Sequence, residues 1–366
     1  MMGGQQKSGG GLIPLPLLAL AIVALLAALW AGLLRLGWAW PVLRPALPAA
    51  HGPLMVSGFL GTLISLERAI ALHRPGAFLA PLFTGIGGLL LAGLPAVWGA
   101  LLITLGSLGL VALFGVMLWQ HRTLHTAVMA LGALLWLVGN GLWLGGWSIH
   151  RVVLWWLGFL VLTIAGERLE LSQVLRLPGR VRWLFGLLVA LFTAGVLLSL
   201  ASYPAGMRLA GLGLLLLAAW LVRFDIARRN LRRQGLTRYI AVCLFLGYFW
   251  LGLGGLLALA YGGIPAGPIY DAILHAVFLG FVFSMIFGHA PIIFPAVLQR
   301  PVPYRPRFYS HLITLQLSLL LRVAGDLLLW PEVRRWGGLL NVLVVLLFLA
   351  NIALSVWQGS KTAPAG

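Results

Sequence analysis

The chain is poor in cysteine and in acidic residues. Cys243 is the only cysteine among 366 residues, which excludes intrachain disulfides, zinc knuckles, iron–sulfur clusters and CxxC haem attachment. Aspartate and glutamate together number 7, against 25 lysine and arginine residues, and charged residues form only 9% of the chain. The sequence contains no P-loop, no dinucleotide-binding glycine motif and no plausible Ser-His-Asp set, which argues against ATP-driven transport and hydrolase chemistry.

The chain is instead rich in long apolar runs. Hydrophobic residues form 61% of the chain and the mean hydropathy is +1.02, values that exclude a soluble globular protein. Runs of about 20 residues, the length that crosses the hydrocarbon core of a bilayer, recur throughout, and the alternating pattern of an outer-membrane barrel is absent. The sequence predicts an all-α polytopic protein whose main partner is the lipid bilayer.

Twelve transmembrane spans are expected. Clusters of Pro, Gly, Arg and Trp separate them, and no linker is long enough to divide the chain into domains. We therefore expect a cytoplasmic tail over residues 1–12, one membrane domain over 13–357 and a second cytoplasmic tail over 358–366. The expected spans cover residues 13–34, 49–73, 78–95, 98–120, 124–146, 151–173, 182–203, 206–223, 239–262, 270–298, 308–330 and 336–357.

The net charge of +18 indicates membrane topology and not nucleic-acid binding, because the basic residues occupy short loops between spans. With the N-terminus inside, 16 lysine and arginine residues fall on the inner side and 6 on the outer side, while Arg68, Arg168 and Arg322 lie within spans. This excess predicts that both termini are cytoplasmic.

One phrase recurs at equal offsets in spans 2, 6 and 10. Residues 58–68 read Gly-Phe-Leu, then Ile, then Glu-Arg, and residues 158–168 repeat all six positions. Residues 280–289 keep the Gly, the Phe and the Ile but end in His289. The spacing of four spans predicts three pseudo-repeats, over residues of about 13–120, 124–223 and 239–357.

A histidine precedes each copy of this phrase. His51 and His275 are expected at similar depth near the outer face, whereas His150 is one residue out of register. Two opposed imidazoles on facing helices make a low-spin bis-His haem site, and Gly58, two turns deeper than His51, would leave room for a flat macrocycle. The alternatives are a solvated interface residue for His51 and a hydrogen-bonded core histidine for His275.

Ionisable side chains inside spans cost free energy unless they are paired or hydrated. Glu67–Arg68 and Glu167–Arg168 are sequence neighbours that point about 100° apart on a helix, so we expect their partners on other helices. These residues either carry protons from the cytoplasm towards a buried centre or fasten the inner ends of the helices to loops.

Three further residues complete the polar set. Arg322 and Asp326 lie four residues apart on span 11, and we expect a structural ion pair between them. His289 lies roughly 21 Å along a straight helix from His275, so the two cannot ligate one metal ion. His289 then belongs to a second metal site or a proton path, or is solvated. Span 7 has no histidine, so the three-histidine copper site of an oxygen reductase cannot be built.

The opening of span 2 resembles the NnrS family. His51, Met55, Gly58 and Phe59 match a family helix that opens with His and continues with Met and Gly-Phe. Residues 53–54 are Pro and Leu where that family has a second His and a Glu.

Span 10 is similar to a second helix of the same family. His275, Ala276, Gly280 and Met285 match its pattern of His-Ala, a Gly five residues on and a Met ten residues on. The three-by-four arrangement is also similar to subunit I of haem–copper oxidases, in which helices two and ten supply the axial histidines of the low-spin haem.

These resemblances imply a haem protein of the bacterial inner membrane. It would hold a b-type haem between His51 and His275, near Met55, Gly58 and Met285, with copper as a further cofactor and a respiratory-chain protein as a partner. It would handle or sense nitric oxide or transfer electrons, and it would not reduce oxygen. The alternatives are a cofactor-free proton-coupled secondary transporter and an assembly factor for a respiratory complex. Whether the protein is an enzyme stays open.

Overall fold

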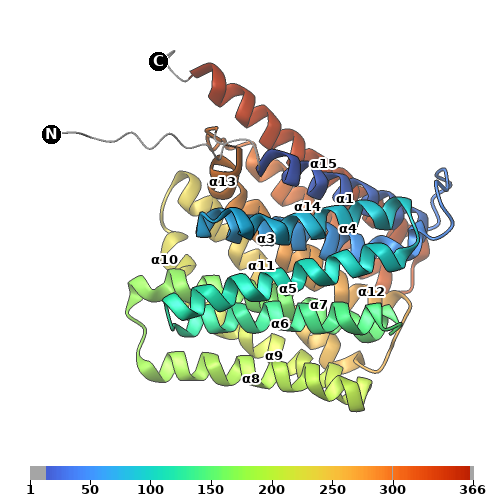
Figure 1. Ribbon diagram of the computed structural model, residues 1–366, viewed down its shortest axis with the longest axis horizontal. Coiled ribbons are helices and arrows are strands. Elements are labelled where there is room, and N and C mark those ends of the chain that lie inside the picture. Colours follow the sequence, from blue (N-terminus) through green and yellow to red (C-terminus); the bar gives the residue numbers. More distant parts are fainter. Residues whose placement is uncertain (1–13, 299, 363–366) are drawn as a thin grey trace.

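The computed structural model describes residues 14–298 and 300–362 as a helical bundle without strands in those ranges (Figure 1). The expected N-terminal tail, residues 1–12, lies outside the described residues. Eleven segments within the described ranges are long and apolar enough to cross a membrane, as expected of a multi-pass membrane protein. Helices described below begin and end within five residues of the expected spans.

Most of the long segments consist of one α-helix. Short 3₁₀ turns precede or follow some of the helices. Residues 227–230 form the one-turn helix α10 between two long helices. The single helices are α1 (Pro14–Arg35), α4 (Leu79–Gly93), α5 (Ala96–Gln120), α6 (Leu124–Leu144), α7 (Ile149–Leu171), α8 (Gly179–Ala201), α9 (Tyr203–Phe224), α11 (Gly235–Tyr261), α14 (Phe308–Leu327) and α15 (Pro331–Thr362), and the 3₁₀ turns are η1 (Leu47–Ala50), η3 (Pro75–Phe78) and η4 (Ser172–Leu175).

Two segments change helical geometry at corresponding points. The one that opens with His51 passes from α2 (His51–Pro53) into the π-helical segment η2 and then α3, and the one with His275 passes from α12 into the π-helical segment η5 and then α13. The corresponding α7 is α-helical throughout. Because π-helical turns are rare and concentrate at functional sites, they single out these two segments. Their bounds are η2 (Leu54–Gly61), α3 (Thr62–Leu72), α12 (Pro268–His275), η5 (Ala276–Phe283) and α13 (Ser284–Leu298).

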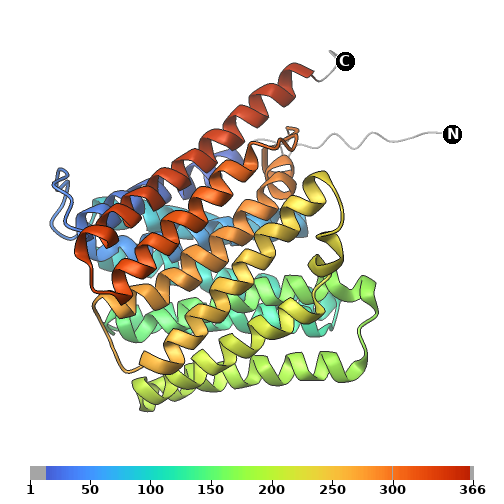
Figure 2. The ribbon, with the colours of Figure 1, turned by 180° about the vertical axis from the view of Figure 1, so that it is seen from behind.

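Neighbouring helices pack in chain order across the bundle. Helices α8, α9 and α11, the α12–α13 segment, α14 and α15 lie side by side across the face seen in Figure 2. The α14 helix occupies the place of the expected eleventh span but is less apolar than the eleven segments above, since it carries Arg322 and Asp326. The α15 helix continues to Thr362, so residues 358–362, expected in a tail, are helical.

The three segments with the recurrent phrase are the most buried. Burial reaches 67, 78 and 67% in their most apolar windows, against 28–56% in the other eight. The glycines of the phrase lie at close helix crossings: a Cβ added at Gly58 would lie 3.1 Å from the Cβ of Ala24, and one added at Gly158 would lie 2.7 Å from Leu135. The space beside Gly58, expected to accommodate a macrocycle, is therefore filled by α1.

Candidate functional site

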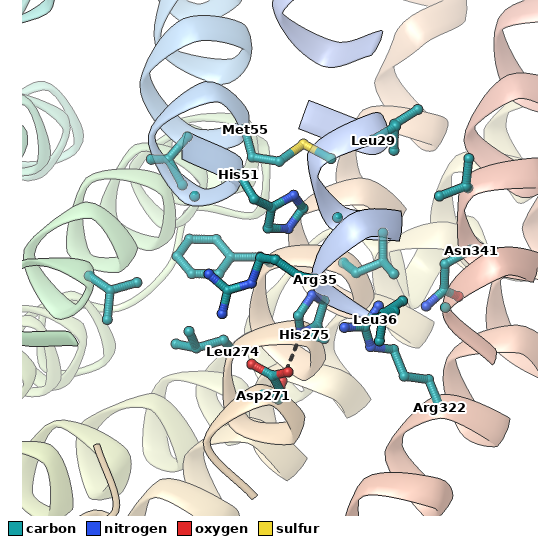
Figure 3. A pocket seen from close by; sticks show the side chains of 18 of the residues that line it. Leu29, Arg35, Leu36, His51, Met55, Asp271, Leu274, His275, Arg322 and Asn341 are labelled. Atoms are coloured by element: carbon teal, nitrogen blue, oxygen red, sulfur yellow. Dashed lines mark hydrogen bonds between the residues drawn. The ribbon is translucent and has the colours of Figure 1, made fainter. Parts of the chain in front are cut away.

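His51 and His275 meet at one end of the bundle although they are far apart in sequence. Their ring centroids are 6.4 Å apart and their planes differ by 19°. Both imidazoles line one cavity, as Figure 3 shows. One of them opens α2 and the other closes α12, so each lies at the α-helical turn just before a π-helical segment.

A backbone carbonyl orients each of the two rings. The Nδ1 atom of His51 lies 2.8 Å from the carbonyl oxygen of Ala28, and that of His275 lies 2.8 Å from the carbonyl oxygen of Asp271. A carbonyl oxygen only accepts hydrogen bonds, so Nδ1 is the donor in both rings and Nε2 of the neutral imidazole keeps its lone pair. Within the described residues neither Nε2 atom has a hydrogen-bond partner. The cavity thus presents two ligand nitrogens that the protein does not use.

Gly32 on α1 makes room for the ring of His51. A Cβ at this position would lie 3.0 Å from Cε1 and 3.1 Å from Nδ1 of the imidazole, closer than ordinary van der Waals contact. The missing side chain lets the ring approach the α1 backbone and reach the carbonyl of Ala28. Gly32 therefore determines where His51 lies.

The cavity between the two histidines is mainly apolar. It holds about 1210 Å³ of atom-free space, part of it open to the outside. Its apolar walls come from α1, both π-helical segments, α7 and α15, and include Leu29, Leu60, Val153, Phe278, Phe283 and Val345.

Arginines and an amide line the polar part of this cavity. Arg35 and Arg322 line it, and neither forms an ion pair with a carboxylate in the part of the chain that the structure describes. The Nε atom of Arg322 is buried without a hydrogen-bond partner, and both side-chain polar atoms of Asn341 are in the same situation. Buried polar atoms are normally paired, so these groups point to a polar ligand.

Arg334 pairs with Asp326, the carboxylate that Arg322 was expected to bind, and also with Asp271. Its guanidinium pairs with Asp271, and its Nε lies 2.8 Å from Oδ1 of Asp326. The expected pair between Arg322 and Asp326 is therefore wrong: a residue from the adjacent helix α15 competes successfully for Asp326. This leaves Arg322 facing the cavity.

The Glu-Arg pairs lie at the opposite end of the bundle. Arg68 forms an ion pair with Glu167 of α7, and its Nη2 lies 3.8 Å from Oε1 of its neighbour Glu67. Arg168 does not pair with Glu167 but with a carboxylate further along the chain. The first and second copies of the phrase are thus joined at their charged ends.

Asp225 holds Arg168 in a buried bidentate ion pair. The distances are 2.7 Å from Nε to Oδ2 and 2.8 Å from Nη2 to Oδ1, and the two side chains are 3% and 0% exposed. The hydroxyl of Tyr248 donates to Oδ2 of Asp225 at 2.9 Å. Nη1 of Arg168 lies 3.4 Å from Nε2 of His289, which brings the third copy of the phrase into the same network.

The other expected site residues take separate positions. Met55 lines the histidine cavity, whereas Met285 fills the space beside Gly247 of α11. His150 stacks edge-on against Tyr203 at 5.6 Å and does not line the cavity. Within residues 14–298 and 300–362, no three His, Cys, Asp or Glu side chains gather where they could hold a metal ion, at His289 or elsewhere.

A comparison with known families finds one matching family model. A family model described as "Domain of unknown function (DUF8744)" matches residues 14–357, nearly the whole described chain. The chain belongs to the DUF8744 family. No curated protein and no solved structure matches it. The NnrS resemblance of the two histidine motifs stays a prediction.

Several features of this DUF8744 protein were not singled out from its sequence. Gly32 and Arg35 lie one turn apart at the end of α1, and only the packing of α1 on α2 shows their role. Asn341 is one of two asparagines in the long apolar helix α15, so the sequence does carry a signal for it. Asp225 follows directly on a span, and nothing in the sequence indicates that it would bind Arg168.

Proposed function

We propose that this DUF8744 protein binds one b-type haem, with His51 and His275 as its axial ligands. The observation that carries the proposal is the pair of nearly parallel imidazoles, 6.4 Å apart, whose Nε2 atoms lack a partner among the described residues. Two metal–nitrogen bonds of roughly 2.0–2.1 Å and two ring radii of about 1 Å add up to about 6 Å, so the separation suits a metal between the rings.

The surroundings favour a porphyrin over a bare metal ion. A bare ion would find only two ligands here, because the described residues contain no cluster of three. A porphyrin brings four nitrogens of its own and needs only two axial imidazoles. The apolar walls suit its faces, and Arg35 and Arg322, which form no ion pair among the described residues, suit its carboxylates.

Electron transfer is the activity that this ligand set supports best. A haem supplies one-electron chemistry, and two axial histidines leave no open iron position for oxygen or nitric oxide. The residues of the chain would fix the ring orientation through the Ala28 and Asp271 carbonyls and exclude water by their apolar walls. A nitric oxide role, copper and a respiratory-chain partner stay predictions from the resemblance.

The proposal includes the membrane arrangement. We take α14 as the eleventh of twelve spans, so that α1–α5, α6–α9 and α11–α15 form three pseudo-repeats, each with its second span buried at the centre. The excess of arginine and lysine at the end opposite to the histidines supports cytoplasmic termini in a bacterial inner membrane. The histidine cavity then lies near the outer face.

A haem assay on purified protein tests the proposal. The protein is expressed with haem available, purified in detergent and assayed by pyridine haemochrome and for copper. We expect one haem b per chain, which is lost in His51→Ala and in His275→Ala. His150→Ala is the matched control, since this histidine lies at the same end but outside the cavity, and it keeps its haem.

Two results would overturn this assignment. One is wild-type protein without haem, and the other is full haem content in both cavity variants. Proton-coupled uptake into liposomes by haem-free protein, abolished by Glu67→Gln, would favour the transporter instead.

A further inference from the structure

The α10 turn lies at one end of the bundle, as Figure 1 shows. A second cavity lies beside this turn, at the end opposite to the histidines. The end of α9, the α10 turn and the connection after η4 enclose it. Its atom-free volume, part of it open to the outside, is about 1250 Å³. The proposed haem site does not involve this cavity.

Arginines dominate the lining of this second cavity. Five of them face it, and none forms an ion pair with a carboxylate among residues 14–298 and 300–362. Arginines that only determine membrane topology can lie anywhere in a cytoplasmic loop, so nothing requires them to surround one cavity. These five residues are Arg223, Arg228, Arg229, Arg232 and Arg233.

The one carboxylate in the lining cannot neutralise these arginines. Asp225 already receives two hydrogen bonds from Arg168 and one from Tyr248, and the backbone N–H of Ala227 donates to its Oδ1 at 2.6 Å. Its charge is therefore used within the bundle. The cavity keeps an uncompensated positive charge that is accessible from outside, because all five of its arginines are exposed: Arg223 at the end of α9, Arg228 and Arg229 on α10, and Arg232 and Arg233 in the turn that follows α10.

We propose that this cavity binds the phosphates of an acidic phospholipid with more than one phosphate in its headgroup. Guanidinium forks suit phosphate oxygens, and basic pockets between transmembrane helices on the cytoplasmic side bind such headgroups. Leu175, Leu177 and Phe224 supply an apolar side to the same cavity. Val174, the chain neighbour of Leu175, is 78% exposed, so acyl chains have an apolar surface beside the arginines.

Lipid titration followed by native mass spectrometry tests this site. The detergent-purified full chain is titrated with cardiolipin, which has two phosphates, with phosphatidylglycerol, which has one, and with phosphatidylcholine. We expect cardiolipin to bind at least about tenfold more tightly than phosphatidylglycerol. Equal binding of these two lipids would overturn the proposal.

Two triple variants with equal loss of charge distinguish lipid binding in this cavity from general electrostatic attraction of the lipid to the basic surface. We expect about tenfold weaker cardiolipin binding when three lining residues are replaced, and a change within about twofold when three exposed arginines outside the lining are replaced. Equal weakening in the two variants would contradict the pocket. The lining variant is Arg229→Gln/Arg232→Gln/Arg233→Gln, and the control is Arg180→Gln/Arg182→Gln/Arg238→Gln.

A competition experiment on the wild-type protein distinguishes a lipid from a soluble anion and does not depend on how the variants fold. Pyrophosphate carries the phosphate charge without acyl chains. We expect bound cardiolipin to persist at pyrophosphate concentrations well above its own. Displacement at comparable concentrations would overturn the lipid assignment in favour of a soluble phosphate ligand.

Discussion

Gly32 lies directly against the imidazole of His51, where a Cβ would approach the ring Cε1 atom to 3.0 Å. The sequence neighbours of His51 do not determine its orientation, because the ring is held by the backbone of α1 through Ala28. The position of His51, which we propose as one axial ligand, thus depends on a glycine in a different helix.

Replacing Gly32 by valine is expected to displace this ring and lower the haem content. The branched side chain needs more room than the ring leaves, so the ring must leave the Ala28 carbonyl. We expect most of the haem to be lost on purification, as measured by pyridine haemochrome per chain. Gly141→Val is the control, since a Cβ there meets nothing within 4 Å. Full haem content in the Gly32 variant would show that the ring does not need this contact.

Arg322 is expected to set the reduction potential of the haem. Its guanidinium lines the cavity without a carboxylate partner in the described chain, and a nearby positive charge stabilises the reduced iron, which carries one positive charge fewer. Arg322→Gln should therefore lower the midpoint potential by on the order of tens of millivolts in a spectroscopic redox titration. Arg151→Gln, at the same end but stacked on Trp147 outside the cavity, should leave it unchanged. A raised potential in Arg322→Gln would contradict the assignment.

The Arg168–Asp225 pair is expected to contribute strongly to stability. Asp225→Asn keeps the shape of the side chain but leaves the buried Arg168 charge unpaired, which costs about 3–5 kcal/mol. The free energy of unfolding, measured by denaturation in mixed micelles, should fall accordingly. Glu332→Gln breaks the exposed pair with Arg335 and should cost about 0–1 kcal/mol. Equal losses of unfolding free energy in the two variants would mean that the buried pair stabilises the protein no more than the exposed pair does.

The helices could be predicted from sequence because the apolar length of a span and its Pro or Gly boundaries are local properties. The π-helical segments could not, because residues 54–61 and 276–283 look like ordinary apolar helix. The expected Arg322–Asp326 pair was wrong for a related reason. Spacing along one helix shows which residues can meet, but only the packing of α15 shows that Arg334 lies closer to Asp326.

The candidate site could be predicted from the sequence only where it is formed by residues that are rare inside spans. His51 and His275 stand out because histidine is uncommon inside spans, and each precedes a copy of the recurrent phrase. Gly32 could not be distinguished from 46 other glycines, since its role exists only where α1 meets α2. Asp225 likewise acquires its function through the fold, which brings the end of α9 to Arg168.

Low-temperature electron paramagnetic resonance of the oxidised, purified protein tests the central claim most directly. Two axial imidazoles with planes 19° apart predict a rhombic low-spin ferric signal, because nearly parallel ligand planes split the iron orbitals unequally. His275→Ala should convert any retained haem to a high-spin signal. A wild-type protein that shows a high-spin haem signal, or none at all, would contradict coordination by His51 and His275.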